Sequence, residues 1–213
     1  MSDARINELR TNLAAVRERI DAAARAAGRE ENQVRLLPVT KFHPAEDLAH
    51  LLELGVTDVA ENREQEARGK ANVVPGIRIH MIGQIQSKKA NSVARWAAGV
   101  QSLDSVALAH GLDRGMALAL ERGDRTSEVL PCHLQLSADG DPARGGVTED
   151  DLDELADVVE AAGHLHLAGL MVVPPLDSRP ADIFARAREL CEHLEERFGR
   201  RMELSAGMSG DLE

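Results

Sequence analysis

The chain has 213 residues, of which 43% are hydrophobic and 29% are charged, and its formal net charge is −11. This composition is typical of a folded protein and excludes a disordered one, and the negative charge argues against nucleic-acid binding through an overall positive field. No apolar run approaches the ~20 residues of a membrane helix, and the amino terminus lacks an apolar signal core. Because only Cys132 and Cys191 are present, we expect a cytoplasmic protein without disulfides.

The first 28 residues predict a leading amphipathic helix. Its apolar positions recur at spacings of three and four, and Gly28 ends the run. The pattern lasts only about two heptads, which is short for a coiled coil, so we expect the helix to pack on the rest of the domain. The positions that form the apolar stripe are Ile6, Leu9, Leu13, Val16 and Ile20.

After this helix, seven short apolar segments alternate with helical patterns. The alternation predicts a parallel sheet with helices, and the number of units favours a (β/α)₈ barrel over an open sheet. No shift in composition divides the chain, so we expect a single domain over residues 1–213, with the eighth strand missing before the chain ends. The expected strands are 36–41, 56–60, 77–82, 99–103, 130–137, 165–173 and 202–205.

The helices between these strands have recognisable starts and stops. Pro44 is favoured at a first helical position, and Gly55 ends the helix that follows. Asp104 or Ser105 is expected to cap one helix and Thr148 another. The expected helices are 44–54, 63–71, a segment through Trp96, one that carries Leu108 to Ala119, one that holds Leu152 to Val159, and a long one that ends at Gly199.

Lys41 ends the first expected strand. The carboxyl end of a buried strand is where α/β proteins usually place their chemistry. Partial burial there disfavours the charged ammonium and frees the amine to form a Schiff base. The alternative is an ordinary lysine that keeps its head in water at the end of a strand.

In a barrel, the carboxyl ends of the strands meet at one mouth. Besides Lys41, residues 205–210 fall at such an end, and their small side chains let backbone N–H groups approach an anion before a helix begins. The alternative is a plain turn. A lysine amine and a phosphate cradle at one mouth together suit pyridoxal phosphate.

Seven motifs, in order along nearly the whole chain, closely resemble those of the pyridoxal phosphate homeostasis proteins. Each motif is weak alone, but seven in sequence are specific. They are Pro38-Val39-Thr40-Lys41 with Pro44, Ala60-Glu61-Asn62, His80-Met81-Ile82-Gly83, Ile85-Gln86-Ser87-Lys88-Lys89, Ser102-Leu103-Asp104, Gly169-Leu170-Met171, and Ser205-Ala206-Gly207-Met208-Ser209.

The resemblance implies a barrel like the amino-terminal domain of alanine racemase, with the cofactor held on Lys41 as an internal aldimine. It implies that Asn62 lies beside the cofactor ring and that the turn from Ser205 binds the phosphate. The positions that match the family's cofactor site are Lys41, Asn62, His80, Met171, Ser205, Gly207, Met208 and Ser209.

Some of these positions have plainer readings. His80 matches a residue at the mouth but could be a core histidine with its own partner, and Met171 could simply pack in the core. Lys88 and Lys89 resemble a basic pair near the mouth, although two exposed lysines usually mean a solvated face.

The chain departs from the family pattern in three places. Pro38 and Thr40 replace the usual Ala and Ser, and a proline removes one donor from a strand ladder. Residues 138–146 replace a more regular loop that contains a lysine, so that Arg144 is the nearest cation. The family continues with a helix and an eighth strand that supplies an arginine opposite the pyridine nitrogen and further phosphate donors. Because the sequence does not include that segment, we expect an unclosed barrel and weakened cofactor binding.

Two functions fit these residues, a pyridoxal phosphate carrier that serves vitamin B6 homeostasis and a racemase-like enzyme. Racemisation of the alanine racemase type needs a tyrosine from a second domain and partner subunit, and this chain has no tyrosine. The family's arginine opposite the ring nitrogen also makes the ring a poor electron sink. We therefore expect a carrier and not an enzyme, acting as a monomer that passes the cofactor to apoenzymes. A sugar-phosphate barrel enzyme that uses Lys41 lacks a separate acid–base pair.

Overall fold

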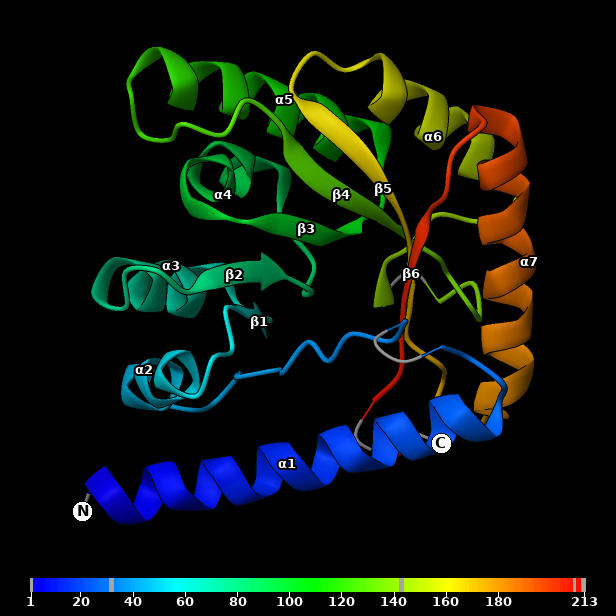
Figure 1. Ribbon diagram of the computed structural model, residues 1–213. Coiled ribbons are helices and arrows are strands. Elements are labelled where there is room, and N and C mark those ends of the chain that lie inside the picture. Colours follow the sequence, from blue (N-terminus) through cyan, green and yellow to red (C-terminus); the bar gives the residue numbers. More distant parts are fainter. Residues whose placement is uncertain (1, 31–32, 142–143, 209, 212–213) are drawn as a thin grey trace.

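The computed structural model describes residues 2–30, 33–141, 144–208 and 210–211. Helices and strands alternate along the chain after a long first helix (Figure 1). The elements are α1 (Ser2–Ala26), α2 (Ala45–Glu53), β1 (Asp58–Glu61), α3 (Glu64–Val73), β2 (Arg78–Met81), the 3₁₀ turn η1 (Ser87–Lys89), α4 (Ala90–Trp96), β3 (Gly99–Leu103), α5 (Val106–Glu121), β4 (Leu130–Gln135), α6 (Leu152–Ala161), β5 (Leu165–Val172), α7 (Pro180–Phe198) and β6 (Glu203–Ala206).

The six strands form one parallel sheet in the order β1-β2-β3-β4-β5-β6. The sheet curls so that helices α2 to α7 surround its outer side, while α1 crosses below it (Figure 1). This is an incomplete (β/α)₈ barrel, as the alternation of segments predicts. Within the described residues the sheet stays open between β6 and the segment that leads to Lys41.

The expected strand over 36–41 is wrong in extent, because only one parallel bridge, from Val39 to Ala60, joins this segment to β1. Pro38 has no N–H to donate, and the chain turns immediately after Thr40. Two backbone hydrogen bonds hold the bridge, from Thr40 N to Ala60 O at 2.9 Å and from Ala60 N to Pro38 O at 2.8 Å.

The core lies between the sheet and the outer helices, and α5 shows how the sequence builds it. Its buried residues Leu108, Leu112 and Met116 recur every four positions, so one face of the helix is apolar. Ser105 caps its amino end by accepting a hydrogen bond from Leu108 N, as expected. Gly115 lets α4 approach closely, because an added Cβ would lie 2.9 Å from Ala94 Cβ.

The leading helix packs on the domain less deeply than the other helices. Of its apolar stripe only Ile20 is buried, while Leu13 is partly buried against the core. Arg5 fixes the amino-terminal half to α2 by donating from Nε to Asp47 Oδ1 at 3.0 Å. This pairing also keeps the pKa of Asp47 below its usual value.

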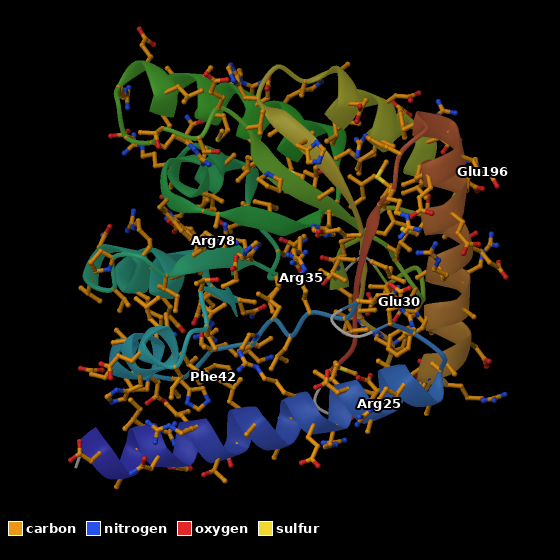
Figure 2. All side chains as sticks on the ribbon, viewed as in Figure 1. Arg25, Glu30, Arg35, Phe42, Arg78 and Glu196 are labelled. Atoms are coloured by element: carbon orange, nitrogen blue, oxygen red, sulfur yellow. The ribbon has the colours of Figure 1, made fainter. Side chains whose placement is uncertain are left out.

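The inner side of the sheet carries charged and polar side chains. Arg35 lies in the middle of the open sheet (Figure 2), and its Nη2 reaches Glu203 Oε1 on β6 at 2.5 Å. His133 Nε2 on β4 lies 3.3 Å from the other oxygen of Glu203. The hydrogen bond from His133 and the charge of Arg35 lower the pKa of Glu203 against the opposing effect of burial.

No helix in the described part of the chain is long and apolar enough to span a membrane. The described residues also contain no group of three or more His, Cys, Asp or Glu side chains placed to hold a metal ion.

Candidate functional site

Lys41 occupies the second position of a tight turn at the carboxyl edge of the sheet. His43 N donates to Thr40 O at 3.1 Å and closes the turn. Phe42 has a φ of 69° and is the only described non-glycine residue with a positive φ, so the turn has the type II pattern, in which the third residue is left-handed. Lys41 is exposed, so the partial burial expected from the sequence is wrong. Its amine has no hydrogen bond or ion pair with any described residue.

Asn62 follows directly after β1, at the carboxyl ends of the strands. Val39 is opposite Ala60, so Lys41 and Asn62 each lie two residues beyond the same bridge. Gly83, which follows β2, packs directly on Asn62, because an added Cβ would lie 2.0 Å from Asn62 O. Only a glycine allows this approach, and it holds the backbone of Asn62 against the end of β2.

Phe42 forms an exposed rim beside Lys41, with 74% of its surface accessible. The guanidinium of Arg63, the residue after Asn62, lies 5.8 Å from the centre of the Phe42 ring. The distance suits a cation–π contact. The segments that follow two neighbouring stretches of the sheet therefore present the amine of Lys41 and the amide of Asn62. Next to them, Arg63 stacks on the ring of Phe42.

His80 has its own partner inside the sheet. Its Nε2 lies 2.8 Å from Asp58 Oδ1 on β1, and Gly99 makes room for the ring, since an added Cβ would lie 2.6 Å from His80 Nδ1. Burial lowers the pKa of His80 more than Asp58 raises it, which favours the neutral ring. Burial raises the pKa of Asp58, but hydrogen bonds from Arg78, His80 and Thr57 outweigh it and bring the value to about 2. Contact of His80 with a cofactor stays a prediction.

Met171 and Ser205 are paired across β5 and β6. Met171 is 4% exposed, so it packs in the interior close to the mouth. Ser205 Oγ donates to Gln101 Oε1 on β3 at 2.7 Å. Sequence reasoning did not identify Gln101, which is 104 positions away from its partner.

The expected phosphate turn follows β6. Gly207 has a φ of 107°, a conformation that favours glycine, and Met208 is 38% exposed. The backbone N–H of Met208 donates to a carboxylate oxygen of Asp211. The turn therefore has a backbone donor that pairs with an anionic oxygen of the chain itself, and its role as a phosphate cradle stays a prediction. Ser209, the remaining residue expected in this site, lies outside the described residues.

Arg144, expected as the nearest cation, ties a loop to the end of β5. Its Nη2 donates to Val173 O at 3.0 Å and to Pro174 O at 3.2 Å, and its Nη1 contacts Asp139 at 2.9 Å. A parallel bridge from Leu136 to Val147 anchors the same loop. These contacts occupy the guanidinium, so the structure gives Arg144 a role in the loop.

An open hollow of about 840 Å³ lies beside Asn62. Lys89 Nζ lies there, 3.3 Å from Glu64 Oε2, whereas Lys88 is exposed. The expected basic pair thus divides into one paired and one solvated lysine. The lining residues are Asn62, Arg63, Glu64, Gln65, Glu66, Gln84, Ile85, Gln86 and Lys89.

The structure arranges the expected site residues other than His80 in two groups, both at the carboxyl ends of the strands. Lys41 and Asn62 lie on one side of the opening, and Met171, Ser205 and the turn at Gly207 lie on the other. No hydrogen bond or ion pair between described residues joins the two groups. The donor set fits pyridoxal phosphate, because an unpaired amine suits its aldehyde and an N–H that binds a carboxylate oxygen suits its phosphate.

Comparison with known proteins finds a family match over most of the chain. Residues 11–213 match the family model described as alanine racemase, N-terminal domain. A protein from Corynebacterium glutamicum named pyridoxal phosphate homeostasis protein is 59% identical over 194 residues, which are 91% of this chain and 88% of that protein.

Two solved structures share the fold. PipY from Synechococcus elongatus, solved with pyridoxal phosphate bound, is 30% identical, with a TM-score of 0.74 over 92% of this chain and 90% of that one. An alanine racemase from Clostridium difficile is 15% identical, with a TM-score of 0.73 over 97% of this chain and 52% of that one. The racemase shares the fold alone, and this chain spans about half of its length.

Proposed function

The chain belongs to the family of pyridoxal phosphate homeostasis proteins, and on this premise we propose that it binds pyridoxal phosphate covalently through Lys41 and serves the homeostasis of this cofactor. The observation that carries the proposal is that, at the carboxyl ends of the strands, an exposed lysine amine without a partner among the described residues lies at the same mouth as a turn whose backbone N–H pairs with an anionic oxygen. The names and the bound cofactor of the relatives support it.

Each residue has a task in this proposal. Lys41 would hold the cofactor through its amine, which would condense with the aldehyde to give a C=N bond and release one water. Pyridoxal phosphate supplies that aldehyde and a phosphate anchor. The N–H of Met208 and the hydroxyl of Ser205 bind the phosphate once Asp211 and Gln101 release them, and Asn62 orients the ring beside Lys41.

We further propose a carrier and not an enzyme. The sequence contains no tyrosine that could act as the second base of an alanine-racemase-type reaction, and the names of the relatives support a role in homeostasis. The same proposal includes apoenzymes as recipients, a monomeric state and a cytoplasmic location. Cys132 and Cys191, both buried and unpaired, are consistent with a reducing compartment.

An absorbance titration with pyridoxal phosphate tests the attachment. We expect the parent chain to develop the visible band of a lysine–cofactor imine, and borohydride reduction followed by peptide mapping to place the cofactor on Lys41. Lys41→Ala should abolish the band, whereas the control Lys88→Ala, which removes another exposed lysine, should keep it. A band of parent intensity in Lys41→Ala contradicts the proposal.

A racemisation assay tests the choice between carrier and enzyme. We expect the loaded protein to interconvert L- and D-alanine no faster than free pyridoxal phosphate at the same concentration. Turnover above that of the free cofactor, lost in Lys41→Ala, would establish the racemase-like alternative.

A further inference from the structure

Side-chain and main-chain groups of three residues meet in the interior next to the segments that carry Lys41 and Asn62. Lys70 on α3 donates from Nζ to Glu61 Oε1 at 2.6 Å and to the backbone oxygen of Thr40 at 2.9 Å. The hydroxyl of Thr40 donates to the same Glu61 oxygen at 2.5 Å. We call Thr40, Glu61 and Lys70 the buried triad.

The triad is secluded from water. Glu61 is 0% exposed, Thr40 4% and Lys70 8%. The second carboxylate oxygen of Glu61, Oε2, is buried and has no hydrogen-bond partner among the described residues. Among the residues that the structure describes, Lys70 is the one cation paired with the Glu61 carboxylate, and removing one member of such a buried pair leaves an uncompensated charge.

The triad is also hydrogen-bonded to the turn that carries Lys41. Thr40 O accepts hydrogen bonds from two sides, from Lys70 Nζ at 2.9 Å and from His43 N at 3.1 Å. The second bond closes the turn over Lys41 and Phe42, in which Phe42 adopts a left-handed conformation that is unfavourable for a bulky side chain. Only the single bridge at Val39 otherwise joins this segment to the sheet. The Thr40 carbonyl is thus the point from which the turn is held.

Glu61 connects the triad to Asn62. It immediately precedes Asn62, and its backbone oxygen accepts from Ile82 N at 3.0 Å. One buried carboxylate therefore links the residue before Lys41 to the residue before Asn62. Lys70 contacts both of these residues.

We propose that Lys70 is a positioning residue for Lys41, which acts through the buried triad to fix the turn at residues 40–43 and hold the Lys41 amine beside Asn62. The inference rests on the proposed function for its importance to cofactor binding. Its geometric content can be measured without the cofactor.

The first test is amide hydrogen exchange at His43 in Lys70→Met. Removing a hydrogen bond to a charged group typically costs about a tenfold factor or more in an equilibrium, so we expect the His43 amide to exchange about tenfold faster than in the parent. Covalent attachment of pyridoxal phosphate should slow by about the same factor. Unchanged exchange at His43 in the folded variant would overturn the proposal.

A matched control separates positioning from general loss of stability. Arg125 is another partly buried cation that donates to backbone oxygens, to Ala94 O at 2.6 Å and Ala97 O at 3.4 Å, at the end of α4 just before β3 begins. Arg125→Met should lower the melting temperature but leave His43 exchange and the attachment rate unchanged. Equal slowing of attachment in both variants at matched folded fraction would overturn the proposal.

Two less disruptive substitutions at Thr40 keep the inference testable if Lys70→Met fails to fold. Thr40→Val removes the hydroxyl bond to Glu61 at nearly constant shape, and Thr40→Ser keeps it. We expect Thr40→Val to accelerate His43 exchange and slow attachment by a few-fold, and Thr40→Ser to restore both to parent values. Identical behaviour of the two variants would overturn the proposal.

Failure of the proposed function has a different signature. If the parent chain forms no band, or the band survives Lys41→Ala, the role of Lys41 is wrong, while His43 exchange still decides whether Lys70 holds the turn. If the band depends on Lys41 but forms at the parent rate in folded Lys70→Met, the positioning role alone is wrong.

Discussion

The middle of the sheet and its two open edges are stabilised by different interactions. All five residues of β3 are buried, β4 and β5 share six paired positions, and α4 packs on α5 with glycines at the contact. At the edges, β6 has no fully buried residue and Val39 is 45% exposed. Charges replace apolar packing there, through the buried triad on one side and the contacts of Glu203 on the other.

The expected cofactor residues belong to these edges. Lys41 and Asn62 lie at one, and Ser205 and Gly207 at the other, while the middle strands supply Gln101 and His133 to the interior. Apolar packing builds a scaffold that tolerates little change, and polar contacts leave the amine and the anion-binding turn accessible. The difference suggests that substitutions in the middle should change stability most, and those at the edges should act mainly on the site.

The largest effect is expected in the middle. Leu112 on α5 is fully buried, and Leu112→Ala should lower the free energy of unfolding by about 2–5 kcal/mol through lost burial and the cavity left behind. Leu118→Ala on the same helix is the control, because Leu118 is 38% exposed and its removal should cost less than about 1 kcal/mol. Chemical denaturation measures both, and equal losses would contradict the contrast between the two regions.

The next effect concerns Asp58 on the inner side. Its pKa is lowered from 3.8 to about 2 in the folded protein, so its contribution to stability is present above pH 3.8 and is lost as the pH falls toward 2. After allowance for solvent screening we expect about 1 kcal/mol. Denaturation of the parent and of Asp58→Asn at several pH values should give curves that converge in this window. A stability difference that is the same at both ends of the window would contradict the assignment.

The sequence predicts the middle of the sheet well because short strand segments alternate there with clearly amphipathic helices. Residues 99–103 were expected as a strand and form β3 with the same bounds, and the spacing of Leu108, Leu112 and Met116 predicts the buried face of α5. These features depend on local periodicity alone.

The edges were harder to predict because their contacts join distant residues. Residues 36–41 are as apolar as a strand but form one bridge, since Pro38 lacks a donor and nothing in the sequence marks the left-handed Phe42. The side chains of Glu61 and Lys70 meet only because α3 folds back onto β1. The pair Ser205–Gln101 likewise requires the curvature of the whole sheet. Motifs therefore suggest which residues form the site, and that assignment stays a prediction, but the partners of these residues require the structure.

A smaller effect is expected at Phe42, where two substitutions separate the backbone strain of its positive φ from its contact with Arg63. Phe42→Ala loses the stack with Arg63 and keeps an L-residue at a φ of 69°, whereas Phe42→Gly loses the stack and relieves the backbone. We expect the glycine variant to be more stable than the alanine variant by about 1 kcal/mol. Thermal unfolding of the pair measures the difference, and a more stable alanine variant would show that the turn does not adopt this conformation.

The smallest effect is expected at the contact that spans the open side. Arg35 and Glu203 lie 2.5 Å apart, but their side chains are 76% and 54% exposed, so the pair should contribute only about 0.5 kcal/mol, and less at high salt. Arg35→Gln should therefore change the unfolding free energy slightly at low ionic strength and not at all in molar salt. Arg197→Gln, which breaks a similar surface pair with Asp157 at 2.6 Å between α7 and α6, is the control. A loss at Arg35 that exceeds the control severalfold and resists salt would mean that this contact holds the two edges together, and that the open side is closed by more than a solvated ion pair.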